Sequence, residues 1–493
     1  MNQKAIVIGA GLGGLSISCL LASRGYDVTV YEKNATYGGK MQEFEMDGYR
    51  FDTGPSLFTM PFILERLFEE CGKSLNDHIS FKEPDPLCRY LYQDQTIFDN
   101  YSNRAETVEE IRKFAPEDEV SYSHFLDYSE KLYTKTADAF LFNPLYQFSD
   151  LKGLNLIDFL GIDAFSSVSK KVDEHFQSDY LRKFFKRFTT YNGSSPFQAP
   201  ATLNVIPHVE LNQGGYYVEG GMYRIADALY ELALSQGVKF EFRSAVQSIQ
   251  VDDSTVSGVT LETGDVINAD LAAANSDATD TILNLLDENA VSRSKRKRQK
   301  SIEPSCSGFV MLLGVEKQWE ELRHHNVFFS ENYEQEFWQI FQEKILPDDP
   351  TIYVANTSFT ESAHAPDGCS NLFVLVNSPY VTKDQDWKEL GESYSSFLID
   401  ELERRSLGGL KKSIAVKKII TPDDFLKLYG SNRGSIYGTS SNGLFSAFVR
   451  PRNKVRGLKN LYLVGGSTHP GGGIPLVVQS AFNAMSLIER HRD

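Results

Sequence analysis

The chain has 493 residues, of which 41% are hydrophobic and 24% charged, and this length predicts at least two domains because it exceeds what one hydrophobic core usually supports. The net charge of −16 argues against nucleic acid as the main partner, because phosphate binding needs a basic surface. The five cysteines form no CxxC pair, which is typical of a cytosolic protein with reduced thiols.

The N-terminal segment predicts a strand, a glycine-rich turn and a helix. Lys4–Ile8 is a short apolar run, a helical pattern follows up to Arg24, and Asp27–Glu32 is the next strand of a βαβ unit. Residues 5–23 carry no charge and could be taken for a membrane span or a signal peptide. The glycines within 9–14 and the absence of a cleavage site favour the buried βαβ unit. No other uncharged stretch has the roughly 20 apolar residues of a span, so the chain is not expected to be a transmembrane protein.

The turn matches the G-x-G-x-x-G pattern of a dinucleotide site. Gly9 permits the tight turn, Gly11 lets the backbone approach a diphosphate, and Gly14 lets helix and strand pack closely; Gly13 lies between them. Glu32, at the end of the second strand, is placed to bind ribose hydroxyls and to repel the extra phosphate of NADP. We therefore expect an adenine dinucleotide here; the alternative is a purely structural glycine turn.

The later elements show two kinds of sequence pattern. Helices are predicted at 99–114, 122–136 and 222–235, strands at 238–242, 245–251, 258–263, 270–274, 309–315, 353–359, 371–380 and 460–466, and a last helix from about Leu476. The pattern of a nucleotide-binding domain recurs twice after the first βαβ unit, around Tyr216 and at 460–466. Two domains are therefore expected, each built from non-contiguous pieces.

The residues after Glu32 indicate which dinucleotide, FAD or NAD, is expected. Gly38-Gly39-Lys40-Met41 and the stretch 48–56 resemble the second fingerprint of the amine-oxidase and phytoene-desaturase flavoprotein superfamily, which NAD dehydrogenases lack. The resemblance implies that Gly39 and Lys40 approach the diphosphate of FAD and that 55–57 line the flavin. An ordinary loop is the alternative interpretation of these glycines.

Further motifs resemble the carotenoid desaturases of this superfamily. They are 191–196 with 199–200, 304–307, 322–326 and, most specific, NLYLVGGSTHPGGGIPLVVQSA at 460–481. The last one places glycines and a helix start, after Pro475, at the flavin, where a helix N-terminus stabilises developing negative charge. It departs from the family at Gly466, usually Ala, and at Leu476, usually Gly. Leu476 is expected to alter the floor of the substrate channel.

The resemblance implies an α/β fold with a Rossmann-type FAD-binding domain and an interleaved α+β substrate domain. The expected FAD-binding domain comprises 1–85, 215–300 and 430–493, and the substrate and membrane-contact domain 86–214 and 301–429. No catalytic residue or proton acceptor is identified. The residues expected to bind FAD are Gly9, Gly11, Gly13, Gly14, Glu32, Lys33, Gly39, Lys40, Met41, Gly54, Pro55, Ser56, Leu57, Val246, Asn275, Gly466, Gly473, Ile474 and Val477.

The implied activity is desaturation of a carotenoid by hydride transfer to flavin N5 in a dry, apolar channel. The stretch 38–61 looks closest to desaturases that introduce a 3',4' double bond into 1'-hydroxylated acyclic or monocyclic, γ-carotene-type carotenoids. Alternatives on the same fold are phytoene desaturation, carotenoid isomerisation and retinoid saturation. An alternative of another class is a non-catalytic prenyl-binding protein like the GDP-dissociation inhibitors (GDI). The electron acceptor, oxygen or a quinone, stays open.

Three further features of the sequence allow more than one interpretation. His324, His325 and His469 lack the spacing of metal ligands, so no metal is expected. The apolar stretch 140–160 is either an interfacial helix pair or part of the core. The basic run 293–300 is more typical of a solvated helix face than of a site for anionic lipid. Because carotenoids reside in bilayers, we expect a cytoplasmic protein peripherally associated with the inner face of the membrane.

Overall fold

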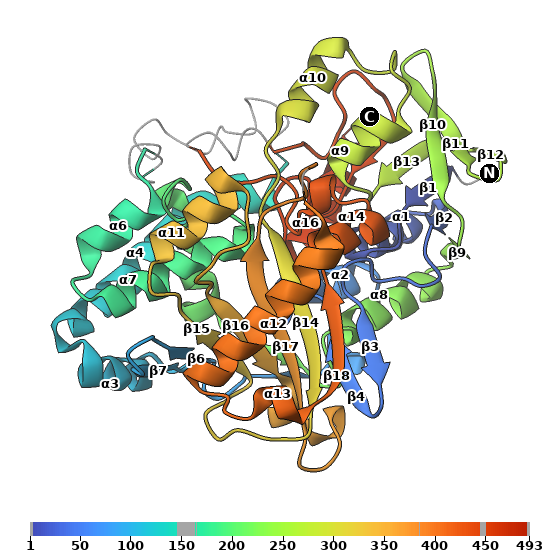
Figure 1. Cartoon of the computed structure of the whole chain (residues 1–493). Helices are drawn as coiled ribbons and strands as arrows, with labels where there is room; N and C mark the ends of the chain where they lie inside the picture. The colour runs from blue at the N-terminus through green and yellow to red at the C-terminus, as the bar shows by residue number, and fades with distance from the viewer. Residues whose placement is uncertain (1–2, 145–162, 164, 384, 444–449, 491–493) are drawn as a thin grey trace.

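The computed structural model describes residues 3–144, 163, 165–383, 385–443 and 450–490. Two large sheets organise the chain, with helices packed on and between them (Figure 1). A parallel sheet lies toward the end that contains the N-terminus, and a mixed sheet runs through the other part. The α/β, Rossmann-type fold expected from the sequence is confirmed.

The parallel sheet has five strands in the order β19-β13-β1-β2-β9. Its strands are β1 (Lys4–Ile8), β2 (Asp27–Glu32), β9 (Lys239–Phe242), β13 (Leu271–Ala274) and β19 (Leu461–Leu463). Both faces are buried. Ala5 and Val7 of β1 pack on one side and Ile6 and Ile8 on the other, because successive side chains of a strand point to opposite faces.

Two different layers cover this sheet. Four helices pack on one face of the sheet: α1 (Leu12–Ser23), α2 (Pro61–Glu70), α8 (Arg224–Ser235) and α16 (Ile474–Glu489). A three-stranded antiparallel sheet packs on the other face, and its strands are β10 (Val246–Asp252), β11 (Thr255–Leu261) and β12 (Val266–Asn268).

The mixed sheet has seven strands in the order β18-β14-β17-β16-β15-β6-β7. They are β6 (Cys88–Leu91), β7 (Ile97–Asn100), β14 (Ser307–Val315), β15 (His325–Phe328), β16 (Ile352–Asn356), β17 (Ser370–Ser378) and β18 (Ile414–Ile420). Phe309 and Met311 of β14 face helix α12 (Trp387–Arg405), whereas Val310 and Leu312 point to the opposite face. That opposite face forms part of the wall of the functional site.

The remaining elements complete the layers. Helices α3 (Arg104–Phe114), α4 (Glu119–Ala137), α6 (Val168–His175) and α7 (Asp179–Lys186) surround an aromatic core beside the mixed sheet. Smaller elements are β3 (Glu43–Met46), β4 (Tyr49–Asp52), β5 (Phe81–Lys82), β8 (Tyr217–Val218), α9 (Ala278–Asp280), α10 (Arg293–Ser301), α11 (Tyr333–Trp338), α13 (Leu410–Ser413) and α14 (Pro422–Tyr429).

The predicted elements are largely confirmed, and the differences lie at boundaries. Residues 99 and 100 belong to β7, and α3 begins only at Arg104 because the side chain of Asn103 caps its first turn. Strand β11 begins earlier than predicted, at Thr255, since a two-residue turn of left-handed Asp253 and Ser254 joins it to β10. The last helix begins at Ile474, not Leu476. The predicted domain boundaries stay a prediction.

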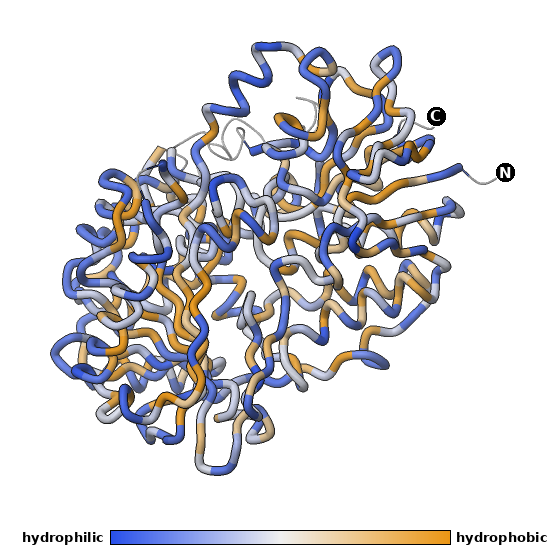
Figure 2. The backbone as a smooth tube through the Cα atoms, turned by 45° about the vertical axis from the view of Figure 1, so that its right-hand side comes forward, coloured by the Kyte–Doolittle hydropathy of each residue, from blue (hydrophilic) through white to orange (hydrophobic). Residues whose placement is uncertain are grey.

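The hydrophobic segments lie mainly in the inner strands and helices, and the outer loops are mostly hydrophilic (Figure 2). The basic run forms helix α10, whose Arg293, Lys297, Arg298 and Lys300 are exposed. Arg296 instead donates to the carbonyl oxygens of Ile282 and Leu283. None of the described helices is both long enough and apolar enough to cross a bilayer.

Candidate functional site

The first glycine turn lies between β1 and α1 and is held by Glu32 at the end of β2. The Glu32 carboxylate accepts hydrogen bonds from the backbone N–H of Ala10 at 2.7 Å and of Asn34 at 2.8 Å. Its side chain also lines the cavity that the turn borders. Glu32 therefore fixes the turn, in addition to the ribose contact expected of it.

Glycines in this turn stand where a side chain has no room. A Cβ at Gly14 would lie 2.0 Å from the carbonyl oxygen of Gly9, so glycine lets α1 pack closely on β1. A Cβ at Gly11 would lie 2.6 Å from Nδ2 of Asn275. Gly9, Gly11 and Asn275 line the cavity, whereas Gly13 and Gly14 do not and serve the packing of the helix.

The second glycine element docks directly on the first turn. Gly38 forms a parallel β-bridge with Gly11, and its N–H donates to the carbonyl oxygen of Ala10 at 2.8 Å. Gly39 and Met41 follow in the cavity wall. The two glycine elements, distant in sequence, thus form one continuous wall.

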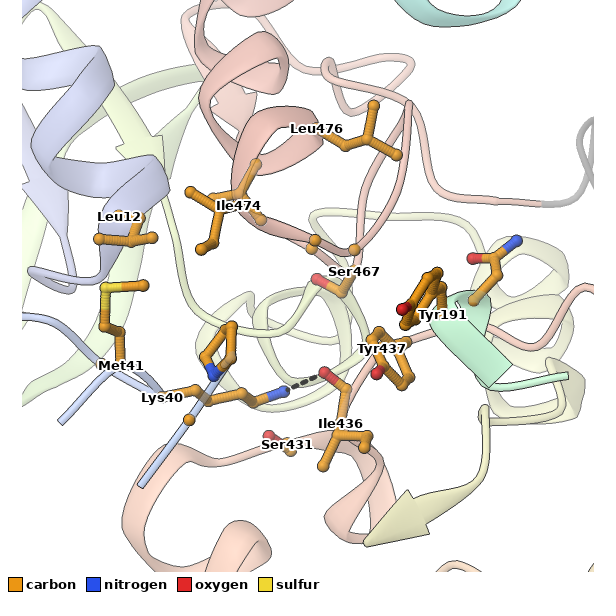
Figure 3. A pocket seen from close by; sticks show the side chains of 18 of the residues that line it. Leu12, Lys40, Met41, Tyr191, Ser431, Ile436, Tyr437, Ser467, Ile474 and Leu476 are labelled. Atoms are coloured by element: carbon orange, nitrogen blue, oxygen red, sulfur yellow. Dashed lines mark hydrogen bonds between the residues drawn. The ribbon is translucent and has the colours of Figure 1, made fainter. Parts of the chain in front are cut away.

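Lys40 links this wall to a segment near the C-terminus. Its Nζ donates to the carbonyl oxygens of Ser435 and Ile436 at 3.1 Å each, and Figure 3 shows the bond to Ile436. Burial lowers the pKa of Lys40 to about 8, although the nearby Asp277 carboxylate opposes the shift. A buried amine thus stands in the cavity wall.

Two helices begin at the cavity without a side-chain cap from any described residue. The N-cap of α1 is Gly11, and that of α16 is Gly473, with Pro475 in the first turn. Unpaired backbone N–H groups and the helix dipole place partial positive charge at both points. Such helix starts bind phosphates and stabilise anionic groups. This geometry fits FAD, whose diphosphate and flavin both require such groups.

One cavity of about 930 Å³ joins all these elements. Of the residues expected to bind FAD, those that line it are Gly9, Gly11, Glu32, Lys33, Gly39, Lys40, Met41, Gly54, Pro55, Ser56, Leu57, Val246, Asn275, Gly466, Gly473, Ile474 and Val477. Gly13 and Gly14 are the two exceptions. We call the part of the cavity bounded by the glycine elements the cofactor end.

The cavity continues to a substrate end with apolar and aromatic walls. Val310, Phe373 and Leu375 of the mixed sheet form one part of the wall, and Tyr191 and Tyr437 another. In Figure 3 the two tyrosines lie across the pocket from Leu12 and Met41 of the cofactor end. Leu476 also lines the cavity, as its predicted effect on the channel floor requires.

Arg450 is a site residue that the sequence analysis missed. Its guanidinium donates to the carbonyl oxygens of Gly466 and Thr439 and to Oδ1 of Asn192, each at 3.1 Å. Burial lowers its pKa to about 10, so it stays protonated at neutral pH. Arg450 thus joins the C-terminal motif to the substrate end. Arg450 lies in no recognised sequence motif, so its role could not be predicted from the sequence.

Arg187 and Glu210 form a second missed feature, at the substrate end. Arg187 Nη2 lies 2.9 Å from Glu210 Oε1, and the side chains are 9% and 2% exposed. Arg187 also donates to the hydroxyl groups of Tyr191 and Tyr90. Arg187 and Glu210 line the cavity. No sequence motif indicates this pair, because the two residues come together only when the segments beside the aromatic core fold.

His324, His325 and His469 each form a hydrogen bond with another protein group. Ring Nδ1 of His324 lies 2.6 Å from Thr360 Oγ1, Nδ1 of His325 lies 2.6 Å from Tyr353 Oη, and Nε2 of His469 lies 3.0 Å from the carbonyl oxygen of Asn143. Burial lowers the pKa of His325 to about 3, and the charge of Arg187 adds to the shift. His325 is therefore neutral at neutral pH.

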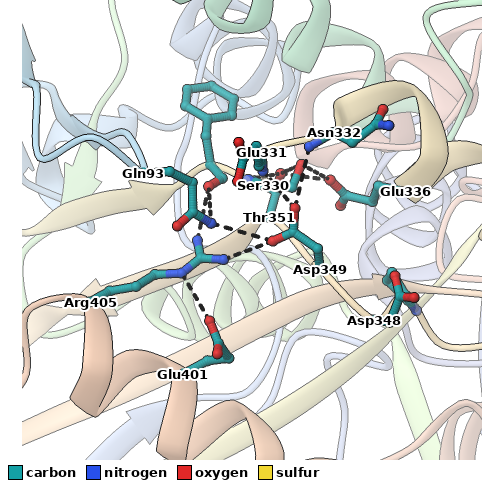
Figure 4. A network of polar contacts seen from close by, with 12 residues as sticks. Gln93, Ser330, Glu331, Asn332, Glu336, Asp348, Asp349, Thr351, Glu401 and Arg405 are labelled. Carbon is teal, nitrogen blue, oxygen red and sulfur yellow. Dashed lines mark hydrogen bonds and ion pairs between the residues drawn. The ribbon is translucent and has the colours of Figure 1, made fainter.

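A polar network supports the cavity wall from behind (Figure 4). The Glu336 carboxylate accepts hydrogen bonds from Ser330 Oγ at 2.8 Å and Thr351 Oγ1 at 2.7 Å. Asp349 accepts from Arg405 Nη2 at 3.0 Å. Because Thr351 also lines the cavity, the network fixes the position of that part of the wall.

The stretch 140–160 lies mostly outside the described residues. Of its described part, Phe140 and Leu141 line the cavity and Phe142 packs against the core of the parallel sheet. Gln479 of α16 donates to the carbonyl oxygen of Phe142 at 3.3 Å. This part of the stretch is therefore attached to the cofactor end.

Comparisons with known proteins agree with this geometry. Residues 12–487 match the family model of flavin-containing amine oxidoreductases. The chain is similar to 4,4'-diaponeurosporene oxygenase of Staphylococcus aureus strain MW2, with 37% identity over 496 residues that cover 97% of each chain.

Solved structures share the fold at low identity. An oxidoreductase from Methanosarcina mazei matches 99% of this chain and 100% of its own with a TM-score of 0.66 and 16% identity. RAB GDI from Plasmodium falciparum matches 99% of this chain and 98% of its own with a TM-score of 0.57 and 11% identity. The fold alone therefore does not separate a flavoenzyme from a GDI; the family match does.

Proposed function

Because the chain belongs to the flavin-containing amine oxidoreductase family and is an FAD-dependent oxidoreductase, we propose that it oxidises a carotenoid. The observation that carries this proposal is the single cavity that joins the cofactor end to an apolar, aromatic substrate end. A long polyene has no polar groups along its length, so such a wall matches its chemistry. The name of the 37% identical relative points to the same substrate class.

The protein's own residues have three tasks in this reaction. Val310, Phe373 and Leu375 exclude water and hold the chain by hydrophobic contact. The helix starts at Gly11 and Gly473 would hold the anionic parts of the cofactor. Bound FAD supplies the two-electron oxidation. Forming a double bond removes a hydride and a proton from the substrate, and oxygen or a quinone finally takes the two electrons.

The finer proposal is 3',4'-desaturation of a 1'-hydroxylated carotenoid. The resemblance of 38–61 to late-acting desaturases and the position of Leu476 in the cavity wall support it. A second candidate is oxygenation of a carotenoid, which the name of the Staphylococcus aureus relative favours. The two reactions differ in product mass, because desaturation removes two hydrogens and oxygenation adds oxygen.

The test incubates the yellow holoprotein with 1'-hydroxy-γ-carotene, lycopene, phytoene and 4,4'-diaponeurosporene under ¹⁸O₂. Loss of two hydrogens without label from the hydroxylated carotenoid supports desaturation, and ¹⁸O in the product supports oxygenation. Flavin-free Gly11→Val protein is the control. If none of the four polyenes is consumed while the flavin remains reducible by dithionite, the proposed function is wrong.

We also propose that the protein binds a membrane surface peripherally, because carotenoids reside in bilayers. The exposed basic residues of α10 are the candidate contact, in place of the merely solvated face that the sequence favours, since anionic lipid attracts such clusters. Sedimentation with vesicles of anionic and of neutral lipid tests it. Replacing Arg293 and Lys297 with Glu should weaken binding to the anionic vesicles only, and equal sedimentation with both lipids would contradict the role of α10.

A further inference from the structure

Arg450 is a buried cation that has no carboxylate partner among the described residues. Each of the other buried arginines that the structure describes forms an ion pair at 2.7–2.9 Å: Arg50 with Asp52, Arg89 with Asp99 and Arg187 with Glu210. The acceptors of Arg450 are instead uncharged, namely the carbonyl oxygens of Tyr437, Thr439 and Gly466 and the amide oxygen of Asn192. Arg450 therefore brings an unbalanced positive charge into the protein.

The ionisation of Arg450 reflects the same lack of a counter-charge. Burial lowers its pKa to about 10, and no described carboxylate opposes the shift. Burial acts in the same direction on Arg50, but there the charge of Asp52 outweighs it and raises the pKa. A buried charge without a counter-charge is unfavourable. Because Arg450 lines the cavity, an anionic group bound in the cavity can supply that counter-charge.

Arg450 lies against the glycines that precede α16. Its Nη1 donates to the carbonyl oxygen of Gly466 at 3.1 Å, and a Cβ at Gly471 would lie 3.5 Å from its guanidinium carbon. Its other described acceptors belong to residues 192, 437 and 439, and none lies in the turn before α1, where the diphosphate is expected. The cation thus stands beside the motif that is expected to hold the flavin ring.

Reduction of bound FAD is the step that creates a negative charge at this place. The oxidised flavin ring is neutral. A hydride carries two electrons and one proton, so its arrival at N5 leaves the ring with one net negative charge, while the second hydrogen of the substrate leaves separately as a proton. Reoxidation by oxygen or a quinone removes the two electrons and the added proton, and the charge disappears. A nearby cation therefore meets its partner only in the reduced state.

We propose that Arg450 is the counter-charge of the reduced flavin and thereby raises the reduction potential of bound FAD. The arginine is charged in both states, but the attraction exists only after reduction and so stabilises the reduced state alone. The positive end of α16 acts in the same direction. This role rests on the flavin ring lying at the start of α16, and it is independent of which substrate is oxidised.

The first test measures how tightly the holoprotein binds sulfite. The sulfur lone pair forms a bond to flavin N5 and leaves a negative charge on the ring, so the adduct resembles the reduced flavin in charge. Arg450→Met should weaken sulfite binding about 10- to 100-fold. The reduction potential, measured against reference dyes, should fall by the same factor, which is about 30–60 mV for a two-electron couple. Arg450→Lys keeps the charge and should restore most of the affinity.

Three outcomes of this test are informative. Unchanged sulfite affinity and reduction potential in flavin-containing Arg450→Met would overturn the proposal. A lower FAD content with unchanged sulfite affinity would also overturn it, because the charge would then belong to the diphosphate. Neither measurement uses a carotenoid, so the expected shifts without any polyene oxidation would contradict only the proposed function.

Two variants of Asn192 test the charge without removing Arg450. Asn192→Asp places a carboxylate oxygen where the amide oxygen lies 3.1 Å from Nη2, so it lowers the local charge by one unit with little change of shape. This variant should weaken sulfite binding at least about tenfold. Asn192→Leu loses the same hydrogen bond without a change of charge and should bind sulfite like the wild type. Wild-type affinity in Asn192→Asp, or an equal loss in both variants, would overturn the proposal even if Arg450→Met does not fold.

Discussion

The two ends of the cavity are built in different ways. At the cofactor end the wall is built around three glycine elements, namely the turn before α1, the element at Gly38 and the start of α16. At the substrate end it is built from side chains, from the aromatic wall at Tyr191 to the pair of Arg187 and Glu210.

This difference separates what is common to flavoproteins from what can be particular to this chain. A backbone site tolerates few residue types, because a Cβ at Gly11 or Gly14 would collide with its neighbours. A side-chain site can change its selectivity by single substitutions that leave the fold intact. Four predictions test this division.

The largest effect is expected at the cofactor end from Gly11→Val. The new side chain would meet Asn275, whose Nδ2 lies 2.6 Å from the position of a Cβ, and would block approach of the diphosphate. Purified protein should be colourless, with no flavin absorbance. Gly408→Val, at a glycine with nothing within 4 Å of its Cβ position, is the control and should stay yellow. A yellow Gly11→Val protein would show that the dinucleotide site is misplaced.

Next comes Arg450, which connects the two ends. Arg450→Met should lower the free energy of unfolding by about 3–5 kcal/mol, because one buried acceptor, the carbonyl oxygen of Thr439, and two partly buried ones, on Gly466 and Asn192, lose a charged donor. Urea unfolding measures this, with the exposed Arg112→Met as control. If the two variants unfold at the same urea concentration, Arg450 does not hold the ends together.

A smaller, pH-dependent effect is expected behind the substrate end. Burial raises the pKa of Glu336 to about 7 from its ordinary value of 4.5, although hydrogen bonds from Thr351 and Ser330 oppose the shift. A raised carboxyl pKa stabilises the fold at pH below 4.5, and this stability is lost as the pH rises through 7. The loss over this range is roughly 3 kcal/mol.

Comparison with Glu336→Gln isolates this group, because glutamine does not ionise. Between pH 5 and pH 8, the wild-type free energy of unfolding should fall by roughly 2–3 kcal/mol more than that of the variant. Flavin content should not change over this range in either protein, since Glu336 supports the substrate end. Parallel pH profiles would show that Glu336 is already ionised at pH 5.

The smallest effect is expected at Leu476, which lines the cavity in the first turn of α16. Leu476→Ala removes a few methylene equivalents from the channel wall, which changes selectivity by about 1–3 kcal/mol, or roughly ten- to two-hundred-fold at most. The substrate should slide further, so chromatography should show more products of successive oxidation. An identical product distribution would mean that Leu476 does not limit the position of the chain.

From the sequence alone, most of the residues that line the cofactor end could be named, and their contact with FAD stays a prediction. Glycines, a carboxylate after the second strand and a helix start at fixed spacing follow from local backbone geometry, and local geometry is encoded by neighbouring residues. Of the residues expected there, only Gly13 and Gly14 do not line the cavity: Gly14 lets α1 pack on the end of β1, and Gly13 lies against Asn275 and Gly465.

The substrate end was decided by tertiary structure. Arg187 and Glu210 meet because two short helical segments, Arg187–Asn192 and His208–Asn212, pack into the same aromatic core. Arg450 finds its acceptors in three separate segments. No spacing in the chain encodes such contacts. Side chains from distant segments meet only where the packing of a buried core leaves no other arrangement, and that is a property of the folded chain as a whole.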